Sequence, residues 1–302
     1  TPRVDLSSRE VEGSIALRGA RLDQLILKNY TESLDEDSKL INLLKKSNEP
    51  GSYFIQFGWM PANGFENIKV PDNSSLWKAS KNKLSPNNDI TLSWDNGEGI
   101  TFFQDISIDE TFMFTINQRI KNNSQKIISL HPFGLVSRKG KPKTIDFFVL
   151  HEGPLGVFNG ELFENSYEDL IDAANNSNNK TKDIKIDGDD SGGWTGFSDK
   201  YWLTALIPNQ NDKVNFRYKY FPNENIFQTD YYGDKITISP NDETQVISRA
   251  FAGAKKLSLL DNYEEKYNIK FFDKAIDFGW FYFLTKPLFY ALNFLSTLVG
   301  NF

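Results

Sequence analysis

Cysteine is absent from this chain of 302 residues. Without thiolates there can be no disulfide framework, no cysteine nucleophile and no zinc site built on sulfur. A chain of this length can bury a core large enough to fold without disulfides, so their absence does not identify a compartment. The missing cysteines therefore exclude chemistry but leave the location open.

Histidine is also scarce, and acidic residues outnumber basic ones. Lys and Arg number 34 against 40 Asp and Glu, which gives a formal net charge of −6. Nucleic-acid binding requires a basic face, so this balance argues against a nucleic-acid partner. The chain has two histidines, no Gly-x-Ser-x-Gly elbow and no glycine-rich phosphate loop. We therefore expect no catalytic residue, no bound metal and no cofactor.

Aromatic side chains are abundant, with 25 Phe, 12 Tyr and 6 Trp. Apolar and polar residues alternate in 111–117, 184–186, 215–220 and 236–238, which is typical of strands with one buried face. Turn dipeptides separate such runs, at Asn63-Gly64, Asn96-Gly97, Asn159-Gly160 and Asp187-Gly188. Many strands with short turns and few helical gaps predict an antiparallel sandwich rather than βαβ units.

Two segments interrupt the strand pattern. Residues 32–48 are charged and carry an apolar patch at 40–44, and we expect an excursion that packs loosely on the sheets. Residues 165–182 open with a helical turn and continue into an Asn-rich run, which indicates a mobile loop. Gly19 and Gly253 adjoin strand patterns, and we expect a bulge or a left-handed turn that disfavours a Cβ at each.

Beyond Ala254 the period becomes that of a helix. Leu257, Leu260, Tyr263 and Tyr267 fall at helical spacing with charged residues between them. We therefore divide the chain into a β body, residues 1–254, and a helical segment, residues 255–302.

The stretch from Ile276 to Val299 is long enough to span a bilayer, but Lys286 and Pro287 stand near its middle. A lysine at the bilayer centre costs about 3 kcal/mol, and a proline removes a helical hydrogen-bond donor. Two short helices meeting at Pro287 and lying in the membrane interface fit better, although burial against the β body or pairing with another copy would also cover this surface. The expected membrane-interface residues are Trp280, Phe281, Tyr282, Phe283, Lys286, Pro287, Leu288, Phe289, Tyr290, Leu292, Phe294, Leu295 and Leu298.

Three groups of residues could carry chemistry. His131 and His151 could form the acid and base of a sugar-opening site, but hydrogen bonding at strand ends explains each of them better. The stretch 187–192 resembles the opening of a calcium loop, yet Ser198 stands where the closing bidentate Glu belongs, so a polar turn is favoured. The aromatic residues of Gly193-Trp194 and Tyr201-Trp202 could stack on a sugar, although core packing is the usual role of such residues.

Several motifs resemble the large periplasmic domain of the YidC-type membrane protein insertase. They cover most of the chain, namely Val11–Asp23 continuing to Tyr30, Gly134–Arg138, His151–Pro154, Gly192–Trp194, Tyr201–Pro208, Phe251–Gly253, Asp277–Trp280 and Lys286–Phe289, with Gly300-Asn301 at the end. The C-terminal motifs are the most specific. One departure is Ala254, where the family pattern has Pro, and it affects only that local turn.

The resemblance implies a galactose-mutarotase-like β-supersandwich followed by C-terminal amphipathic helices. It also implies a periplasmic domain of a multi-pass protein of the bacterial inner membrane, which assists insertion and folding of membrane proteins. The implied partners are the SecD–SecF subunits of the Sec translocon, nascent membrane proteins and the bilayer surface, and we expect a monomer without enzymatic activity. The alternative is a carbohydrate-binding or mutarotase-like domain.

Overall fold

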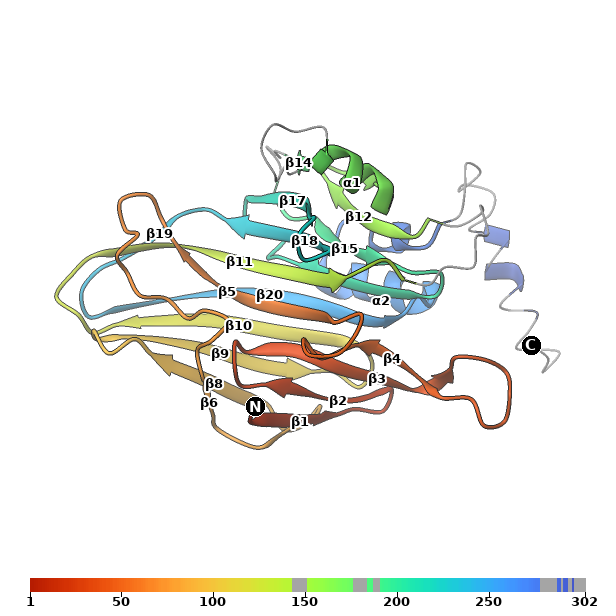
Figure 1. The fold of residues 1–302 in the computed structure, drawn as a ribbon, viewed down its shortest axis with the longest axis horizontal. Coiled ribbons are helices and arrows are strands. Elements are labelled where there is room, and N and C mark those ends of the chain that lie inside the picture. The colour runs from red at the N-terminus through yellow and green to blue at the C-terminus, as the bar shows by residue number, and fades with distance from the viewer. Residues whose placement is uncertain are drawn as a thin grey trace.

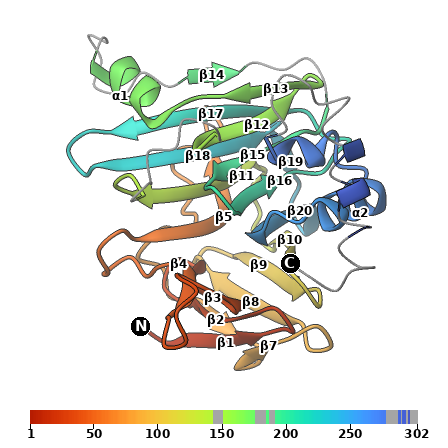
Figure 2. The same ribbon diagram turned by 90° about the vertical axis from the view of Figure 1, so that its right-hand side faces the viewer.

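The computed structural model describes residues 1–142, 151–175, 184–186 and 191–277, together with 287, 288, 290–292 and 295. We call residues 277–302 the C-terminal segment. Two large β-sheets lie face to face, and helices cover one end of them (Figures 1 and 2). The mainly β class and the antiparallel supersandwich are confirmed.

The first sheet contains, in spatial order, β14 (Ile184–Ile186), β17 (Val214–Phe221), β18 (Ile226–Gly233), β11 (Ile128–Lys139), β5 (Tyr53–Pro61), β3 (Arg21–Thr31), β2 (Val11–Ala16), β1 (Arg3–Ser7) and β7 (Lys83–Leu84), with β19 (Ile236–Ile238) paired to β11 and β4 (Leu40–Leu44) paired to β3. The second sheet contains β13 (Glu161–Glu164), β12 (Gly153–Phe158), β15 (Trp194–Ser198), β16 (Trp202–Ile207), β20 (Asp242–Ala254), β10 (Met113–Asn122), β9 (Ile100–Ile108), β8 (Ile90–Asp95) and β6 (Lys78–Ala79). Among these strands of the described residues, the one parallel pair is β1 with β7.

The abundant aromatic residues form the core of the sandwich. In β17, Val214, Phe216 and Tyr218 are buried, while the residues between them are partly exposed, as strand alternation requires. The largest fully buried side chains are Trp194, Tyr218, Tyr231, Tyr263, Phe102, Phe112, Phe114, Phe158, Phe197, Phe227, Phe251 and Phe272. Rings of this size fill the space between two sheets with little loss of side-chain entropy.

Two of the predicted turn dipeptides close hairpins. Asn96-Gly97 joins β8 to β9, and Asn159-Gly160 joins β12 to β13. Asn159 and Gly160 have φ values of 51° and 78°, the positive angles that a tight hairpin turn needs. Asn63-Gly64 forms a turn after β5 but does not join two hairpin strands, and 187–188 lie outside the described residues.

The interpretation of residues 32–48 as a loosely packed excursion is wrong. Residues 40–44 form strand β4, which pairs with β3 and places Leu43 and Leu44 in the core. The leucines drive this pairing because burial of each side chain contributes roughly 1.5–3 kcal/mol, whereas the charged residues before them stay in the connecting loop. The helical turn expected after residue 165 is present as α1 (Tyr167–Asn175), and the Asn-rich stretch 176–180 lies outside the described residues.

The change to helical spacing after Ala254 is also confirmed. Strand β20 ends at Ala254, and helix α2 (Leu257–Tyr267) buries Leu257, Leu260 and Tyr263. A short 3-10 helix, η1 (Phe272–Ala275), follows it. Among the described residues, no helix is both long enough and apolar enough to span a bilayer.

Candidate functional site

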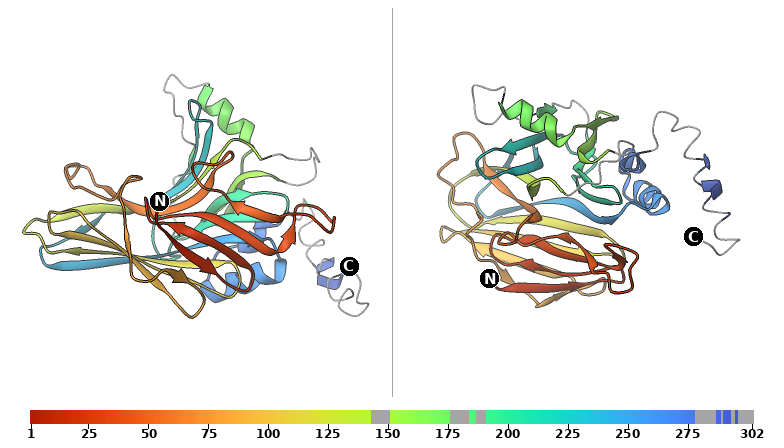
Figure 3. Two further views of the ribbon diagram at one scale, coloured as in Figure 1. Left: turned by 60° about the horizontal axis from the view of Figure 1, so that its bottom comes forward. Right: turned by 45° about the vertical axis from the view of Figure 1, so that its right-hand side comes forward.

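Residues from segments far apart in the sequence meet at the end of the β body where the C-terminal segment leaves. We call this group the junction cluster; it comprises Arg138 of β11, Glu152 before β12, Asp199 between β15 and β16, Lys255 after β20 and Asp277 after η1. The end lies on the right-hand side of Figure 1, where α2 is drawn, and Figure 3 shows the molecule from two other sides. Three of these five residues, Arg138, Glu152 and Asp277, lie within motifs that carry the resemblance to the insertase domain.

Arg138 is the buried centre of the cluster. Its Nη1 lies 2.6 Å from Asp199 Oδ1 and donates a second hydrogen bond, of 3.2 Å, to the phenol oxygen of Tyr167. The guanidinium also stacks over the ring of Tyr53, with 4.6 Å between its carbon and the ring centroid. Burial opposes the charge on Arg138, but the attraction and hydrogen bond of Asp199, together with smaller contributions from Tyr167 and Tyr53, hold the pKa of Arg138 above its ordinary value. The charged pair therefore joins the first sheet, the second sheet and α1.

Lys255 contributes a second positive charge, and it loses its proton more readily than an ordinary lysine. Its Nζ donates a 2.8 Å hydrogen bond to Ser198 Oγ. Burial lowers the pKa of Lys255 to about 8, while the nearby carboxylates of Asp199, Asp277 and Glu152 act in the opposite direction. The cluster therefore contains an ammonium group that loses its proton in mildly alkaline solution.

We expect Lys255 to raise the free energy of unfolding as the pH increases from 8 to about 9.5. In this interval the folded chain gives up the proton while the unfolded chain, with an ordinary lysine pKa of 10.5, keeps it. The unfolded state then binds more protons, so stability increases with pH, by about 1–2 kcal/mol over the interval. Urea unfolding at pH 7, 8 and 9 measures the change.

Lys255→Met should remove this pH dependence, whereas Lys256→Met, at the exposed neighbouring position, should keep it. If Lys255→Met shows the same slope of stability against pH as the unaltered chain, Lys255 is not the titrating group.

The first residue of the C-terminal motif is tied to the β body. Asp277 accepts a 3.2 Å hydrogen bond through Oδ2 from the backbone N–H of His151, and Glu152 Oε1 accepts one of 3.0 Å from the backbone N–H of Lys200. Two motifs that are 126 positions apart in the sequence thereby meet. Asp277 is consequently held near the start of β12, which Glu152 in turn ties to the β15–β16 turn.

The two histidines do not form an acid–base pair. His131 Nδ1 lies 2.9 Å from the carbonyl oxygen of Gly233, and His151 Nε2 lies 3.3 Å from that of Pro154. His131 precedes Arg138 by seven residues along β11, a separation of roughly 23 Å in a strand. His131 thus lies far from the junction cluster and from His151, which directly precedes Glu152 of that cluster, and the hydrogen-bonding interpretation of both residues is confirmed.

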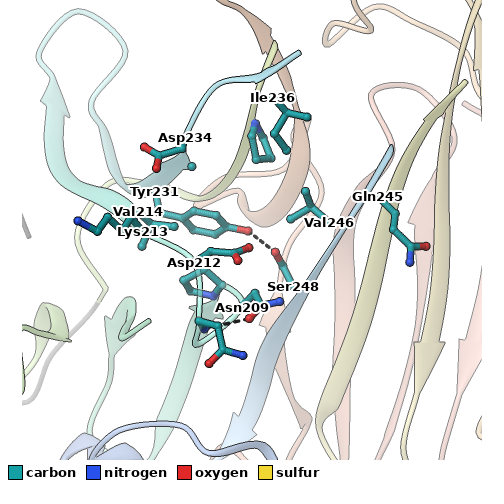
Figure 4. Close-up of a pocket in the computed structure, with 14 residues that line it drawn as sticks. Asn209, Asp212, Lys213, Val214, Tyr231, Asp234, Ile236, Gln245, Val246 and Ser248 are labelled. Carbon is teal, nitrogen blue, oxygen red and sulfur yellow. Dashed lines mark hydrogen bonds between the residues drawn. The ribbon is translucent and has the colours of Figure 1, made fainter. Parts of the chain in front are cut away.

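A cavity of about 440 Å³ opens between the two sheets, away from the junction cluster (Figure 4). Its lining residues are Pro132, Pro208, Asn209, Asn211, Asp212, Lys213, Val214, Tyr231, Gly233, Asp234, Ile236, Gln245, Val246 and Ser248. Tyr231 donates a 2.7 Å hydrogen bond to Ser248 Oγ, and burial together with the charge of Asp234 raises the pKa of Asp212. His131 does not line the cavity, because neighbouring side chains of a strand point to opposite faces and Pro132 takes the inward position.

The sequence did not reveal this cavity. Only the polar run 209–212 after strand β16 marks it, and such runs are common in loops. The size lies within the range of small-molecule sites, and the carboxylate and amide groups could hydrogen-bond a polar ligand.

The two dipeptides considered for sugar stacking, Gly193-Trp194 and Tyr201-Trp202, differ in their surroundings. Trp194 is fully buried, its indole N–H donates a 3.2 Å hydrogen bond to the carbonyl oxygen of Lys270, and its ring meets Phe272 edge-on. The core interpretation is therefore right for Gly193-Trp194. Tyr201 is 57% exposed at the β15–β16 turn, whereas Trp202 is half-buried and packs against the core.

One group of carboxylates has the spacing of a metal site. Oxygen atoms of Asp261, Glu264 and Asp273 lie within 4.8 Å of one another. Glu264 Oε2 also accepts a 3.3 Å hydrogen bond from the backbone N–H of Asp273, which ties α2 to η1. The calcium-like stretch lies largely outside the described residues, since only Ser191 and Gly192 of it are described.

Five of the expected membrane-interface residues belong to the described part of the C-terminal segment. Pro287, Leu288, Tyr290, Leu292 and Leu295 have helical backbone and are exposed. The other eight lie outside the described residues, namely Trp280, Phe281, Tyr282, Phe283, Lys286, Phe289, Phe294 and Leu298.

The arrangement of the sheets is that of a galactose-mutarotase-like supersandwich. A putative aldose 1-epimerase from Escherichia coli K12 superposes with a TM-score of 0.51 at 9% identity, covering 83% of this chain and 98% of that one. A galactose mutarotase-like protein from Lactobacillus casei superposes with a TM-score of 0.50 at 9% identity, covering 83% and 99%. Likeness at this identity shows a shared fold alone.

The family follows from sequence comparison. The family model described as the YidC periplasmic domain matches residues 3–291, and the chain belongs to this family. It is 38% identical over 303 residues to the membrane protein insertase YidC of Rickettsia bellii, covering 100% of this chain and 52% of that protein. It is 39% identical over 307 residues to that of Acidiphilium cryptum, covering 99% and 51%. The chain thus spans about half the length of the curated relatives it matches.

Proposed function

We propose that the chain is a non-catalytic accessory domain of a membrane protein insertase, exposed to the periplasm at the bacterial inner membrane as part of a multi-pass protein. The relatives that share its family are named as insertases, which supports the proposal. The observation that carries it is the junction cluster, because a buried ion pair joins the two sheets there and the Asp277 hydrogen bond ties the start of the C-terminal segment to the same end of the β body. The domain would assist insertion by holding the β body in a defined orientation to the bilayer.

The C-terminal segment supplies the membrane contact in this proposal. Leu288, Leu292 and Leu295 are between 48% and 57% exposed, which is costly for apolar side chains unless lipid or protein covers them. Leu288, Leu292 and Leu295 recur at helical spacing, as on the apolar face of an interfacial helix. The full set of thirteen membrane-interface residues named from the sequence would share this surface, with the aromatic ones at headgroup level.

The remaining parts of the proposal concern partners. The SecD–SecF subunits of the translocon and nascent membrane proteins are the partners that the family resemblance implies. The domain would act as a monomer and without a cofactor. It would consist of a β body, residues 1–254, and a helical segment, residues 255–302, that contacts the membrane.

Vesicle flotation tests the membrane contact. We expect the chain to float with phospholipid vesicles and the chain lacking Asp277–Phe302 to remain at the bottom of the gradient, because the truncation removes the exposed leucines. Circular dichroism should show unchanged β content in the truncated chain. Equal flotation of both proteins, or of neither, would refute the membrane-facing role of the segment.

The alternative, a carbohydrate-binding or mutarotase-like role, is favoured by one observation. The cavity of Figure 4 offers Asn209, Asp212 and Gln245 as hydrogen-bonding groups for hydroxyls. However, neither histidine lines it. Calorimetric titration with common hexoses separates the two proposals, since saturable binding that Asp212→Ala abolishes would support the alternative.

A further inference from the structure

Three aromatic side chains gather at one end of the β body, where Tyr201 is exposed while Tyr30 and Trp202 are half-buried and pack against the core. Tyr30, at the end of β3, meets Trp202 edge-on with ring centroids 5.1 Å apart, and Trp202 in turn lies 6.1 Å from Tyr201. Tyr201 stands on the β15–β16 turn, which is closed by a 2.9 Å hydrogen bond from the N–H of Asp199 to the carbonyl oxygen of Trp202. Two strands of different sheets thus present one aromatic group, which we call the aromatic rim.

Two lysines flank the aromatic rim. Lys200 Nζ lies 4.9 Å from the ring centroid of Tyr201, and Lys256 Nζ lies 5.3 Å from that of Tyr30. Both ammonium groups therefore sit over the rings that the rim presents. They are conspicuous in a chain whose formal net charge is −6.

The rim is continuous with the junction cluster. Tyr201 is two residues from Asp199, and the carbonyl oxygen of Tyr201 accepts a 2.9 Å hydrogen bond from the N–H of Lys255. Lys255 interacts electrostatically with Asp277, where the C-terminal segment begins. The rim and Asp277 consequently lie at the same end of the β body.

We propose that the aromatic rim, with Lys200 and Lys256, is a second contact of this domain with the phospholipid headgroup layer. An exposed Tyr favours this layer because its ring is apolar and its hydroxyl is a hydrogen-bond donor, and lysines near the layer bind lipid phosphates. Tyr201 offers such a ring, whereas the hydroxyl of Tyr30 is buried and its ring supplies the support beneath. The inference rests on the proposed function, because the C-terminal segment must bring this end of the β body to the bilayer. Two separate contacts would fix the tilt of the β body, which a single helix cannot do.

The neighbouring β3–β4 loop shapes the lipid preference. It carries Glu32, Asp35, Glu36 and Asp37 directly after β3, and the exposed Leu34 among them. These carboxylates offset the lysines, so aromatic partitioning supplies most of the affinity. Anionic lipid is expected to strengthen the contact only modestly.

Point variants of the whole chain test the inference on vesicles of phosphatidylethanolamine and phosphatidylglycerol. Tyr201→Ser should lower vesicle partitioning by roughly fivefold, since it removes the most exposed ring, and Tyr201→Trp should retain it. Ile127→Ser is the matched control, because Ile127 is 56% exposed in the β10–β11 turn at the opposite end of the β body. It should partition like the unaltered chain.

A chain with Leu288, Leu292 and Leu295 replaced by Ser separates this inference from the proposed function. If it loses partitioning while Tyr201→Ser equals Ile127→Ser, the C-terminal contact stands and the rim contact is refuted. If it partitions normally while Tyr201→Ser does not, the rim contact stands and the role of the C-terminal segment fails. An unaltered chain that does not bind vesicles at all overturns both.

Discussion

Arg138→Met is expected to lower the free energy of unfolding by about 3–5 kcal/mol, the usual cost of leaving one partner of a buried ion pair alone. Asp199 would lose a charged partner 2.6 Å away in a place where its side chain is only 14% exposed. Tyr167 would lose a donor as well, and the ring of Tyr53 would lose the guanidinium above it. Chemical denaturation at pH 7 measures the loss.

The chain contains a matched control for this substitution. Arg119 Nε also lies 2.6 Å from a carboxylate, that of Asp105, but both side chains are about one third exposed, at 33% and 32%. Solvent screens this pair, so Arg119→Met should cost no more than about 1 kcal/mol. Replacing Arg138 by Met and Asp199 by Leu together should recover part of the loss, because no unpaired charge then remains in the interior. Equal effects of Arg138→Met and Arg119→Met would contradict the buried role of the first pair.

Gly253→Ala is expected to destabilise the chain by about 3 kcal/mol, the upper part of the usual range for overpacking a core. A Cβ on Gly253 would lie 2.2 Å from Cγ of Phe112 and 2.8 Å from its Cβ. The base of the Phe112 side chain cannot swing away, since the ring is fully buried against Phe251. Thermal unfolding followed by circular dichroism measures the effect.

Two other glycines isolate the contribution of backbone angle. Gly19 and Gly97 have φ values of 76° and 77°, but a Cβ on Gly97 meets nothing within 4 Å, whereas one on Gly19 lies 3.2 Å from the carbonyl oxygen of Asn73. Gly97→Ala should therefore cost about 1 kcal/mol from the positive φ alone, and Gly19→Ala slightly more. If Gly253→Ala is no worse than Gly97→Ala, the crowding by Phe112 is not decisive.

These glycines illustrate how far a sequence prediction reaches. The left-handed turn expected at Gly19 is confirmed by its φ of 76°. At Gly253 neither a bulge nor a left-handed turn explains the need for glycine, because its φ is not positive. The constraint comes instead from the side chain of Phe112, which directly precedes β10. The need for glycine was visible locally, but the cause was a contact between strands distant in sequence.

The same limit applies to segment 32–48 and to the candidate site. The charged residues of segment 32–48 suggested a loose excursion, yet residues 40–44 pair with an edge of β3 that was open to them. Arg138 and Asp199 are 61 positions apart, and no local pattern indicates that they share a buried pair. The cavity of Figure 4 likewise arises where the sheets separate, between strands that no short motif connects.

The sequence by itself determined the mainly β class, the hairpins at Asn96-Gly97 and Asn159-Gly160, helix α2 and the family resemblance. Each of these depends on side-chain period or backbone preference within a few neighbouring residues, which is information that a linear pattern contains. Only the tertiary structure decided which buried charges meet, where the cavity opens, and that Tyr30 and Tyr201 lie at the same end of the β body as Asp277. Those features depend on the packing of two sheets, which brings residues that are distant in the sequence close together in space. Such contacts cannot be predicted from the distance between the residues along the chain.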